Sequence, residues 1–286
     1  MRSILRAAAA LVGTLAFGCN GDTPTDPTPT NAVSYTALGA SDGIGFGSSV
    51  PCVPFDPDCP SGTGYVYLLK RRLQRDGRSV TLQNLAVPGA VLSPAMQTLS
   101  RETGHDILST FFDQSTVVLP TTTHLTVFAG GNDANVIAQA IRAGRAGADV
   151  RGYIDQQVNQ WQNDLQDLVR RVRQRAPDTR IVALNLPNLG AAPYVAGLSV
   201  QERSILQRIA VMLTDRINAL TGQGVLVVDL MCEPRTYDAS RFSSDGFHPS
   251  DSGYALMAEL AYPALANNAL PSPSSTCAQR TLLPVF

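Results

Sequence analysis

A serine lies between closely spaced glycines where the first apolar run of the chain ends, in Leu38-Gly39-Ala40-Ser41-Asp42-Gly43-Ile44-Gly45. Gly39-x-Ser41-x-Gly43 has the spacing of a sharp turn between a strand and a helix that presents a nucleophilic serine oxygen. The same glycines, together with Gly45, also resemble a dinucleotide-binding glycine loop. A short motif of glycine and serine is a weak signal alone, so the rest of the chain has to decide between covalent catalysis and nucleotide binding.

The nucleotide interpretation lacks its other residues. A short-chain dehydrogenase needs a tyrosine four residues before a lysine, because the ammonium group lowers the pKa of the phenol for proton transfer. Lys70 is the only lysine of the chain, and position 66 is valine. The second apolar run ends in Gln83-Asn84, where an acidic residue would bind the ribose. We therefore set the dehydrogenase interpretation aside.

A serine nucleophile needs a base, and histidine is the usual one. His105 lies in a polar stretch and His124 lies just before the third apolar run, so both are interpreted as surface or structural residues. His248 differs, because it follows the fifth apolar run and has Asp245 three residues before it. One turn could hold the carboxylate of Asp245 against the imidazole and fix the tautomer that faces Ser41.

The elements between these residues must bring them together. Short apolar runs rich in β-branched residues predict strands buried on both faces, as in a parallel sheet. Five such runs occur, over residues 35–38, 80–85, 125–129, 181–186 and 225–230. Apolar residues at steps of three and four predict helices over 153–173, 199–220 and 251 to about 265. The alternation predicts an α/β fold, a three-layer α/β/α sandwich with a five-stranded, mostly parallel sheet, whose ligands bind beyond the carboxyl ends of the strands.

The α/β-hydrolase fold is one alternative for this chemistry. It also has the order Ser, Asp, His, but it presents its serine after several strands, and its Asp and His lie on separate loops. In this chain Ser41 ends the first run, and Asp245 and His248 are three residues apart. These positions disfavour the α/β-hydrolase fold.

Four short blocks instead resemble the SGNH (GDSL) hydrolases, over residues 35 to about 260. The blocks, each after a predicted strand, are Leu38-Gly39-Ala40-Ser41, Asn84-Leu85-Ala86-Val87-Pro88-Gly89, Gly130-Gly131-Asn132-Asp133 and Asp245-x-x-His248. Any one block is a weak signal, but four in the right order are specific. The resemblance implies a flavodoxin-like hydrolase fold and a secreted serine esterase or lipase. Ala40 is a departure, since the family often has aspartate there, and we expect altered local hydrogen bonding rather than lost chemistry.

The resemblance also implies a role for each matching residue. Ser41 is the nucleophile, His248 is the general base and then the acid, and Asp245 orients His248. The oxyanion hole consists of the backbone N–H groups of Ser41 and Gly89 and the side-chain amide of Asn132. Such donors suit the negative charge that an acyl transfer develops on a carbonyl oxygen. Taken singly, Gly89 could be only a turn residue and Asn132 only a helix cap. No metal or other cofactor is implied.

The first residues are typical of an export signal, here residues 1–19. Two arginines precede an apolar run, and Gly18-Cys19 follows it. A cysteine after a small residue resembles the bacterial lipobox, in which the cysteine is lipidated; an ordinary signal peptide with an incidental cysteine is the alternative. Residues 20–33 begin with a Thr/Pro-rich tract and predict a semi-extended tether. The hydrolase-like domain is then expected over 34–286.

Four cysteines remain beyond Cys19. An even number in an oxidising compartment predicts two disulfides, with three possible connectivities. Cys52 and Cys59 bracket a proline-rich loop that could close on itself, and Cys232 and Cys277 would then pair by default. Buried free thiols are the alternative, and none of the four has the spacing of zinc ligands.

We therefore expect an exported, monomeric serine esterase that acts through a covalent acyl-enzyme on a small-molecule or polymer-borne ester. The net charge of −1 and the lack of a basic stripe argue against nucleic acid as a partner. Lipidation of Cys19 would tether the protein to the bacterial envelope, in the periplasm or at the cell surface, and without it the protein would be secreted. An O-acyltransferase on the same fold, and an inactive lipoprotein that binds glycan or lipid, are the alternatives.

The substrate remains open among lipid, aryl and acylated-carbohydrate esters. The walls of the substrate pocket are expected from four loops, over residues 46–65, 93–123, 188–198 and 231–247. These loops mix aromatic and polar side chains, which suits an aryl or acyl group beside a polar leaving group. The loop between Cys52 and Cys59 follows the serine turn closely and could form a rigid rim of the site.

Overall fold

The computed structural model describes residues 31–283. Within them, five parallel strands form one sheet in the order β2-β1-β3-β4-β5. The strands are β1 (Ala32–Leu38), β2 (Ser79–Asn84), β3 (His124–Val127), β4 (Arg180–Leu184) and β5 (Leu226–Val228). Each overlaps one of the apolar runs, so the parallel sheet predicted from the sequence is confirmed.

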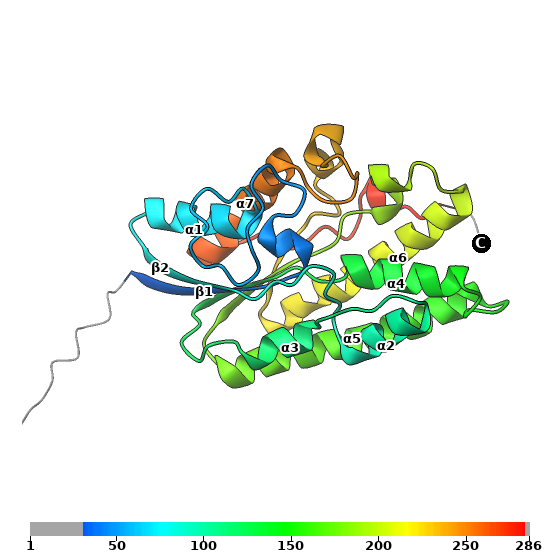
Figure 1. Cartoon of the computed structure of the whole chain (residues 1–286), viewed down its shortest axis with the longest axis horizontal. Helices are drawn as coiled ribbons and strands as arrows, with labels where there is room; N and C mark the ends of the chain where they lie inside the picture. Colours follow the sequence, from blue (N-terminus) through cyan, green and yellow to red (C-terminus); the bar gives the residue numbers. More distant parts are fainter. Residues whose placement is uncertain (1–30, 284–286) are drawn as a thin grey trace, which may run out of the picture. The chain divides into compact units, whose positions relative to one another are not determined.

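Helices cover both faces of this sheet (Figure 1). On one face lie α1 (Tyr65–Arg75) and α7 (Asp251–Asn267), which pack against each other. On the other face lie α2 (Pro94–Glu102), α3 (Phe111–Thr116), α4 (Gly131–Arg142), α5 (Val150–Arg175) and α6 (Val200–Asn218). The predicted three-layer α/β/α sandwich is therefore confirmed.

The predicted helices extend to the residues that cap them. Asp149 accepts a hydrogen bond from the N–H of Gly152, so α5 begins three residues before its predicted start at 153. Ser199 and Glu202 exchange hydrogen bonds in a capping box, which fixes the start of α6. Trp161 and the other apolar residues of the α5 stripe are buried against the sheet, where they form core rather than a binding surface.

The chain leaves the sheet early after β5. The side chain of Asn185 accepts hydrogen bonds from the N–H groups of Leu230 and Met231, at 2.7 and 3.0 Å. These amides therefore bind a side chain instead of a neighbouring strand, and β5 is three residues long rather than the six predicted over 225–230. The turn directs the following segment across the carboxyl edge of the sheet.

Both expected disulfides are present. Cys52 bonds to Cys59 and Cys232 bonds to Cys277, so the favoured connectivity is confirmed. The first closes a short loop after β1, and the second fastens the C-terminal segment to the turn after β5.

Two expectations concern the N-terminal part of the chain. The export signal over 1–19 with Cys19, and the tether as far as residue 30, lie outside the described residues. β1 begins at Ala32, so the strand includes the last two residues of the stretch expected as tether. In the described part of the chain, no helix is both long and apolar enough to span a bilayer.

Candidate active site

The structure brings Ser41, His248 and Asp245 together at the carboxyl edge of the sheet. Ser41 directly follows β1 and begins a short 3₁₀ helix over Ser41–Ile44, and His248 lies in the segment between β5 and α7. The hydroxyl oxygen Oγ of Ser41 lies 2.8 Å from Nε2 of His248. Nδ1 of the same imidazole lies 2.6 Å from Oδ2 of Asp245. The three side chains thus form one hydrogen-bonded chain across 207 residues of sequence.

The carboxylate of Asp245 is held by its own turn. Its Oδ1 accepts hydrogen bonds from the hydroxyl of Ser243 and from the N–H groups of Phe247 and His248, at 2.8, 2.8 and 2.9 Å. Partial burial alone would raise the pKa of Asp245, but the imidazole and these donors outweigh it and hold that pKa well below its usual range. Asp245 is therefore ionised at neutral pH and faces the imidazole as an anion.

Two side chains from distant elements hold the turn that carries Ser41. Buried Gln114 of α3 donates its amide N–H to the carbonyl of Gly39 at 2.8 Å and accepts the N–H of Gly39 at 3.0 Å. Asn84, at the end of β2, donates to the carbonyl of Gly43 at 2.8 Å. A side chain at Gly43 would meet the Cβ of Ala86 at 2.3 Å, so this turn needs glycine there.

The sequence analysis missed both of these side chains as parts of the site. Asn84 appears in the second family block without a role, and no motif surrounds Gln114, whose position follows only from the packing of α3. Ala40, where aspartate is common in the family, is buried in an apolar cluster. Gln114 forms its two hydrogen bonds with the adjacent Gly39.

Unused hydrogen-bond donors lie at the positions expected for an oxyanion hole. Within residues 31–283, the N–H groups of Ser41 and Gly89 bind no acceptor. Gly89 is exposed with a φ of +79°, which a residue with a side chain rarely adopts. Asn132 donates one amide hydrogen to the carbonyl of Ala90 at 2.9 Å, which leaves the other available. The arrangement provides three donors, from Ser41, Gly89 and Asn132.

The start of α4 connects the second and third family blocks. α4 does begin at Gly131, but its N-cap Gly130 makes no side-chain cap hydrogen bond, and neither Asn132 nor Asp133 serves as the cap. Asp133 is fully buried and accepts the N–H of Leu92 at 2.9 Å through Oδ1, while its Oδ2 has no hydrogen bond. Burial raises the pKa of Asp133 to about 6 against the opposing effects of the Leu92 amide and the nearby Trp161 indole.

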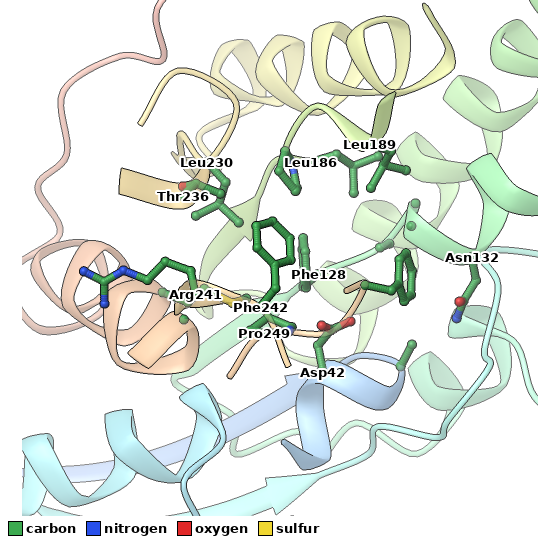
Figure 2. Close-up of a pocket in the computed structure, with 18 of the residues that line it drawn as sticks. Asp42, Phe128, Asn132, Leu186, Leu189, Leu230, Thr236, Arg241, Phe242 and Pro249 are labelled. Carbon is green, nitrogen blue, oxygen red and sulfur yellow. The ribbon is translucent and has the colours of Figure 1, made fainter. Parts of the chain in front are cut away.

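An apolar pocket extends from the serine turn across the ends of β3, β4 and β5 (Figure 2). Its empty volume is about 790 Å³, counting space open to solvent. Its labelled lining residues are Asp42, Phe128, Asn132, Leu186, Leu189, Leu230, Thr236, Arg241, Phe242 and Pro249. Three of the four expected walls contribute, through Phe111, Leu189 and the segment 236–247. The rest of the lining comes from the serine turn, Ala90, the strand ends, the start of α4, Pro249 and α7.

The fourth expected wall is wrong for this pocket. Residues 46–65 contribute none of its lining, because the pocket runs from Ser41 toward β5 and α7 rather than toward the Cys52–Cys59 loop. Phe46 instead packs its ring 4.7 Å from the imidazole of His248, outside the pocket.

The other two histidines lie away from this site. His105 is exposed and binds the carbonyl of Thr103. His124 begins β3, at the amino end of the sheet, where burial and then the nearby guanidinium of Arg180 lower its pKa to about 4. Both positions agree with the interpretation from the sequence.

A serine, a histidine and an aspartate in hydrogen-bonding order at the carboxyl edge of a parallel sheet are an arrangement that is typical of serine hydrolases. The sequence model of the GDSL-like lipase/acylhydrolase family matches residues 34–256, and the chain belongs to this family. The protein is therefore a carboxylic ester hydrolase, and the family implies small-molecule ester substrates.

Solved structures of ester hydrolases share this fold. A lipase from a goat rumen metagenome has a TM-score of 0.56 and 20% identity, over 81% of this chain and 97% of the lipase. Phospholipase A1 from Streptomyces albidoflavus NA297 has a TM-score of 0.51 and 19% identity, over 83% and 100%. An acetyl xylan esterase from Geobacillus stearothermophilus has a TM-score of 0.51 and 15% identity, over 84% and 97%. No curated protein sequence matches this chain significantly.

Proposed function

We propose that this protein is an exported serine esterase that hydrolyses carboxylic esters through a covalent acyl-enzyme on Ser41. The observation that carries the proposal is the chain of hydrogen bonds from Ser41 Oγ through the imidazole of His248 to Asp245. A serine hydroxyl is a weak nucleophile at neutral pH, and a base at hydrogen-bond distance makes it reactive. The family supplies the reaction class, and this geometry supports the assignment of roles.

In the acylation step, Nε2 of His248 takes the proton of Ser41 Oγ as that oxygen bonds to the carbonyl carbon of the ester. The carbonyl oxygen becomes an oxyanion, which the N–H groups of Ser41 and Gly89 and the amide of Asn132 stabilise. The carbon–oxygen bond to the alcohol then breaks, and the alcohol leaves with the proton from His248. Water attacks the acyl-enzyme with His248 again as base, which releases the acid and restores Ser41.

Asp245 holds His248 in position to act as the base. Its carboxylate is already held by Ser243 and by two backbone N–H groups, so it needs no reorganisation when the imidazole gains a proton. The 2.6 Å hydrogen bond to Nδ1 fixes the tautomer whose Nε2 accepts a proton, and the negative charge stabilises the imidazolium that forms.

The pocket supports an apolar group on one side of the ester. Ala40 and Asp42 flank Ser41, and Ala90 follows Gly89. These three residues line the pocket together with Asn132, which is itself a proposed oxyanion donor. The carbonyl carbon would be bonded to Ser41, so the acyl group attached to that carbon is the part that reaches the pocket. His248 does not line it, which suits a leaving alcohol that receives its proton outside the pocket.

Export rests on separate observations. Two disulfides within residues 31–283 are typical of proteins that mature outside the cytoplasm, and the sequence of 1–19 has the features of an export signal. We include lipidation of Cys19 in the proposal. In a bacterial host fed labelled palmitate, the wild-type chain should incorporate label and Cys19→Ser should not; equal labelling of the two would exclude a lipid on Cys19.

The test of the reaction compares two serine variants of the same turn. Ser41→Ala should lose roughly 10⁴- to 10⁶-fold in kcat on p-nitrophenyl butyrate, because the nucleophile is gone. Ser48→Ala is the matched control, since within the described residues the Ser48 hydroxyl binds only the carbonyl of Gly45, so its loss should matter little to turnover. Turnover by Ser41→Ala within about tenfold of wild type would overturn the proposed mechanism.

A further inference from the structure

One carboxyl group in the apolar pocket has no partner. Asp42 follows Ser41 directly, and Figure 2 shows its carboxylate pointing from the turn into the pocket. Apart from its own backbone N–H, it makes no hydrogen bond or ion pair with any residue of the described chain. Arg241 is the other charged residue of the lining, and its guanidinium donates to the carbonyl of Ser252 instead.

This position is costly for a carboxyl group. Asp42 is half-buried, and withdrawing an unpaired carboxylate even partly from water is unfavourable, so proteins usually neutralise or pair such a group. Burial raises the pKa of Asp42, the nearby imidazole of His248 opposes that rise, and the charge of Asp245 adds to it. Tyr65 and Tyr254 are the other titratable groups facing it. An alanine or leucine here would fit an apolar acyl chain at no such cost, so the carboxyl points to a polar requirement of the ligand.

The carboxyl group of Asp42 lacks a hydrogen-bond donor from the rest of the protein, and this indicates the chemistry of the ligand. An ionised carboxylate accepts hydrogen bonds only, and a protonated one also donates. A hydroxyl group can satisfy either form, and an ammonium group can satisfy the ionised form. Because Asp42 is adjacent to Ser41, the partner must sit on one of the first carbons of the acyl group rather than at its far end.

We propose that Asp42 is a specificity-determining residue that makes the pocket select acyl groups with a hydrogen-bond donor, a hydroxyl or an ammonium, close to the ester carbonyl. This inference rests on the proposed function, because it uses Ser41 as the atom to which the acyl carbon is bonded. The remaining lining, Phe128, Leu186 and Phe242 among it, binds the apolar part of the same acyl group. The pocket thus recognises a small acyl group that is apolar overall and polar at one point.

Three methyl esters of equal shape test this selection. Methyl 3-methylbutanoate, methyl 3-hydroxybutanoate and methyl 3-aminobutanoate differ only in the methyl, hydroxyl or ammonium group on the third carbon. The measurement is kcat/KM for each ester at pH 7.5, by titration of the acid released. Asp42→Leu should lower the ratio of hydroxyl or ammonium ester to methyl ester by roughly fivefold to fiftyfold, the effect of one buried hydrogen bond to a neutral or a charged group.

A second variant separates the two donors. Asp42→Asn keeps a hydrogen-bonding oxygen without a charge. If the hydroxyl ester is the preferred ligand, Asp42→Asn should keep the preference that Asp42→Leu loses; if the ammonium ester is preferred, both variants should lose it. Asp238→Leu is the control, since Asp238 is an exposed aspartate between β5 and α7 that does not line the pocket and makes no side-chain cap hydrogen bond to the short helix after it. Ratios that move less than twofold in Asp42→Leu would overturn the proposal.

The inference and the proposed function fail in different ways. Turnover that survives in Ser41→Ala contradicts the proposed function, whereas ester ratios unchanged in an active Asp42→Leu enzyme contradict only the role of Asp42. A binding measurement that does not depend on turnover uses Ser41→Ala and the double variant that also carries Asp42→Leu. For each protein, the rise in Tm is measured with each ester at saturating concentration. A donor-bearing ester should stabilise Ser41→Ala more than the methyl ester does, and Asp42→Leu should remove that difference; equal stabilisation would count against the proposal.

Discussion

Two turns at the carboxyl edge of the sheet each place an aspartate near the imidazole of His248, and they surround the two carboxyl groups differently. The turn before α7 surrounds Asp245 with the donors of Ser243, Phe247 and His248, and the pKa of that carboxyl falls. The turn after β1 gives Asp42 only its own backbone N–H, and burial raises its pKa. The difference separates a carboxylate that is prepared to orient a base from a carboxyl that still needs a ligand.

A third aspartate lies between these extremes. Asp133 accepts one hydrogen bond, from Leu92, while its second oxygen has none, and burial raises its pKa to about 6. The three carboxyls therefore differ in the number of donors that offset burial. The carboxyl groups of Asp42 and Asp133 have the fewest hydrogen-bond donors, and theirs are the pKa values that burial raises.

Between the two turns, the larger effect should come from removing the charge of Asp245. Asp245→Asn presents an amide to Nδ1 of His248, which stabilises the wrong tautomer, so kcat on p-nitrophenyl butyrate should fall roughly 10⁴-fold. Asp42→Asn should cost at most about tenfold on the same ester. Asp238→Asn, at an exposed position, is the control. Similar losses of kcat in Asp245→Asn and Asp42→Asn would mean that the two turns do not differ in function.

The pH dependence of stability should distinguish the buried Asp133. Its folded-state pKa of about 6 exceeds the value near 4 of an unfolded chain. The contribution of Asp133 to the free energy of unfolding is thus most favourable below about pH 4. It is lost as the pH rises through 6, which lowers the free energy of unfolding by roughly 3 kcal/mol at most. Asp133→Asn should flatten this part of the profile of unfolding free energy, measured with urea at pH 4 to 7. Asp245 acts in the opposite sense, because its lowered pKa contributes stability that is lost as the pH falls below about 4.

Asp42 should limit the stability of the free enzyme. Replacing an unpaired carboxyl in an apolar pocket by Leu should raise the free energy of unfolding by about 1–2 kcal/mol at pH 8. The gain should shrink toward about pH 3, below the pKa of about 4 of an aspartate in an unfolded chain, because the carboxyl is then largely neutral in both states. Thermal unfolding at the two pH values measures the gain, and a loss of stability at pH 8 would mean that Asp42 has a structural partner.

The smallest effect concerns the Cys52–Cys59 loop. Because this loop lines no part of the pocket, Cys52→Ser should leave the order of preference among acyl esters within about twofold. Stability should fall by roughly 2–3 kcal/mol, as expected for a loop of this length. A clear change in acyl preference in a fully folded Cys52→Ser variant would show that the loop shapes the substrate site and that the site extends beyond this pocket.

The sequence predicted the residues that lie where strands end, and the reason is geometric. Ser41 follows a strand, His248 precedes a helix, and the carboxyl ends of parallel strands meet at one edge, so order and pattern suffice to bring them together. Strand and helix types were also predictable, because buried parallel strands and amphipathic helices have strong patterns.

The supporting contacts were not predictable in the same way. Gln114 acts on Gly39 across 75 residues, and nothing in the local sequence of α3 marks it. The pocket lining was misjudged in part, since α7 and the strand ends contribute residues such as Met257 and Phe128 while 46–65 contribute none. Such contacts depend on how the helices and loops pack at the carboxyl edge of the sheet. Short sequence motifs do not determine that packing.

The central claim is that Ser41 forms the covalent acyl-enzyme, and labelling tests it most directly. The protein is treated with a fluorophosphonate, digested, and analysed by mass spectrometry to locate the adduct. One adduct on the peptide that contains Ser41, absent from Ser41→Ala and much slower in Asp245→Asn, is the predicted result. Labelling of another residue, or no labelling of a preparation that hydrolyses p-nitrophenyl butyrate, would contradict the account.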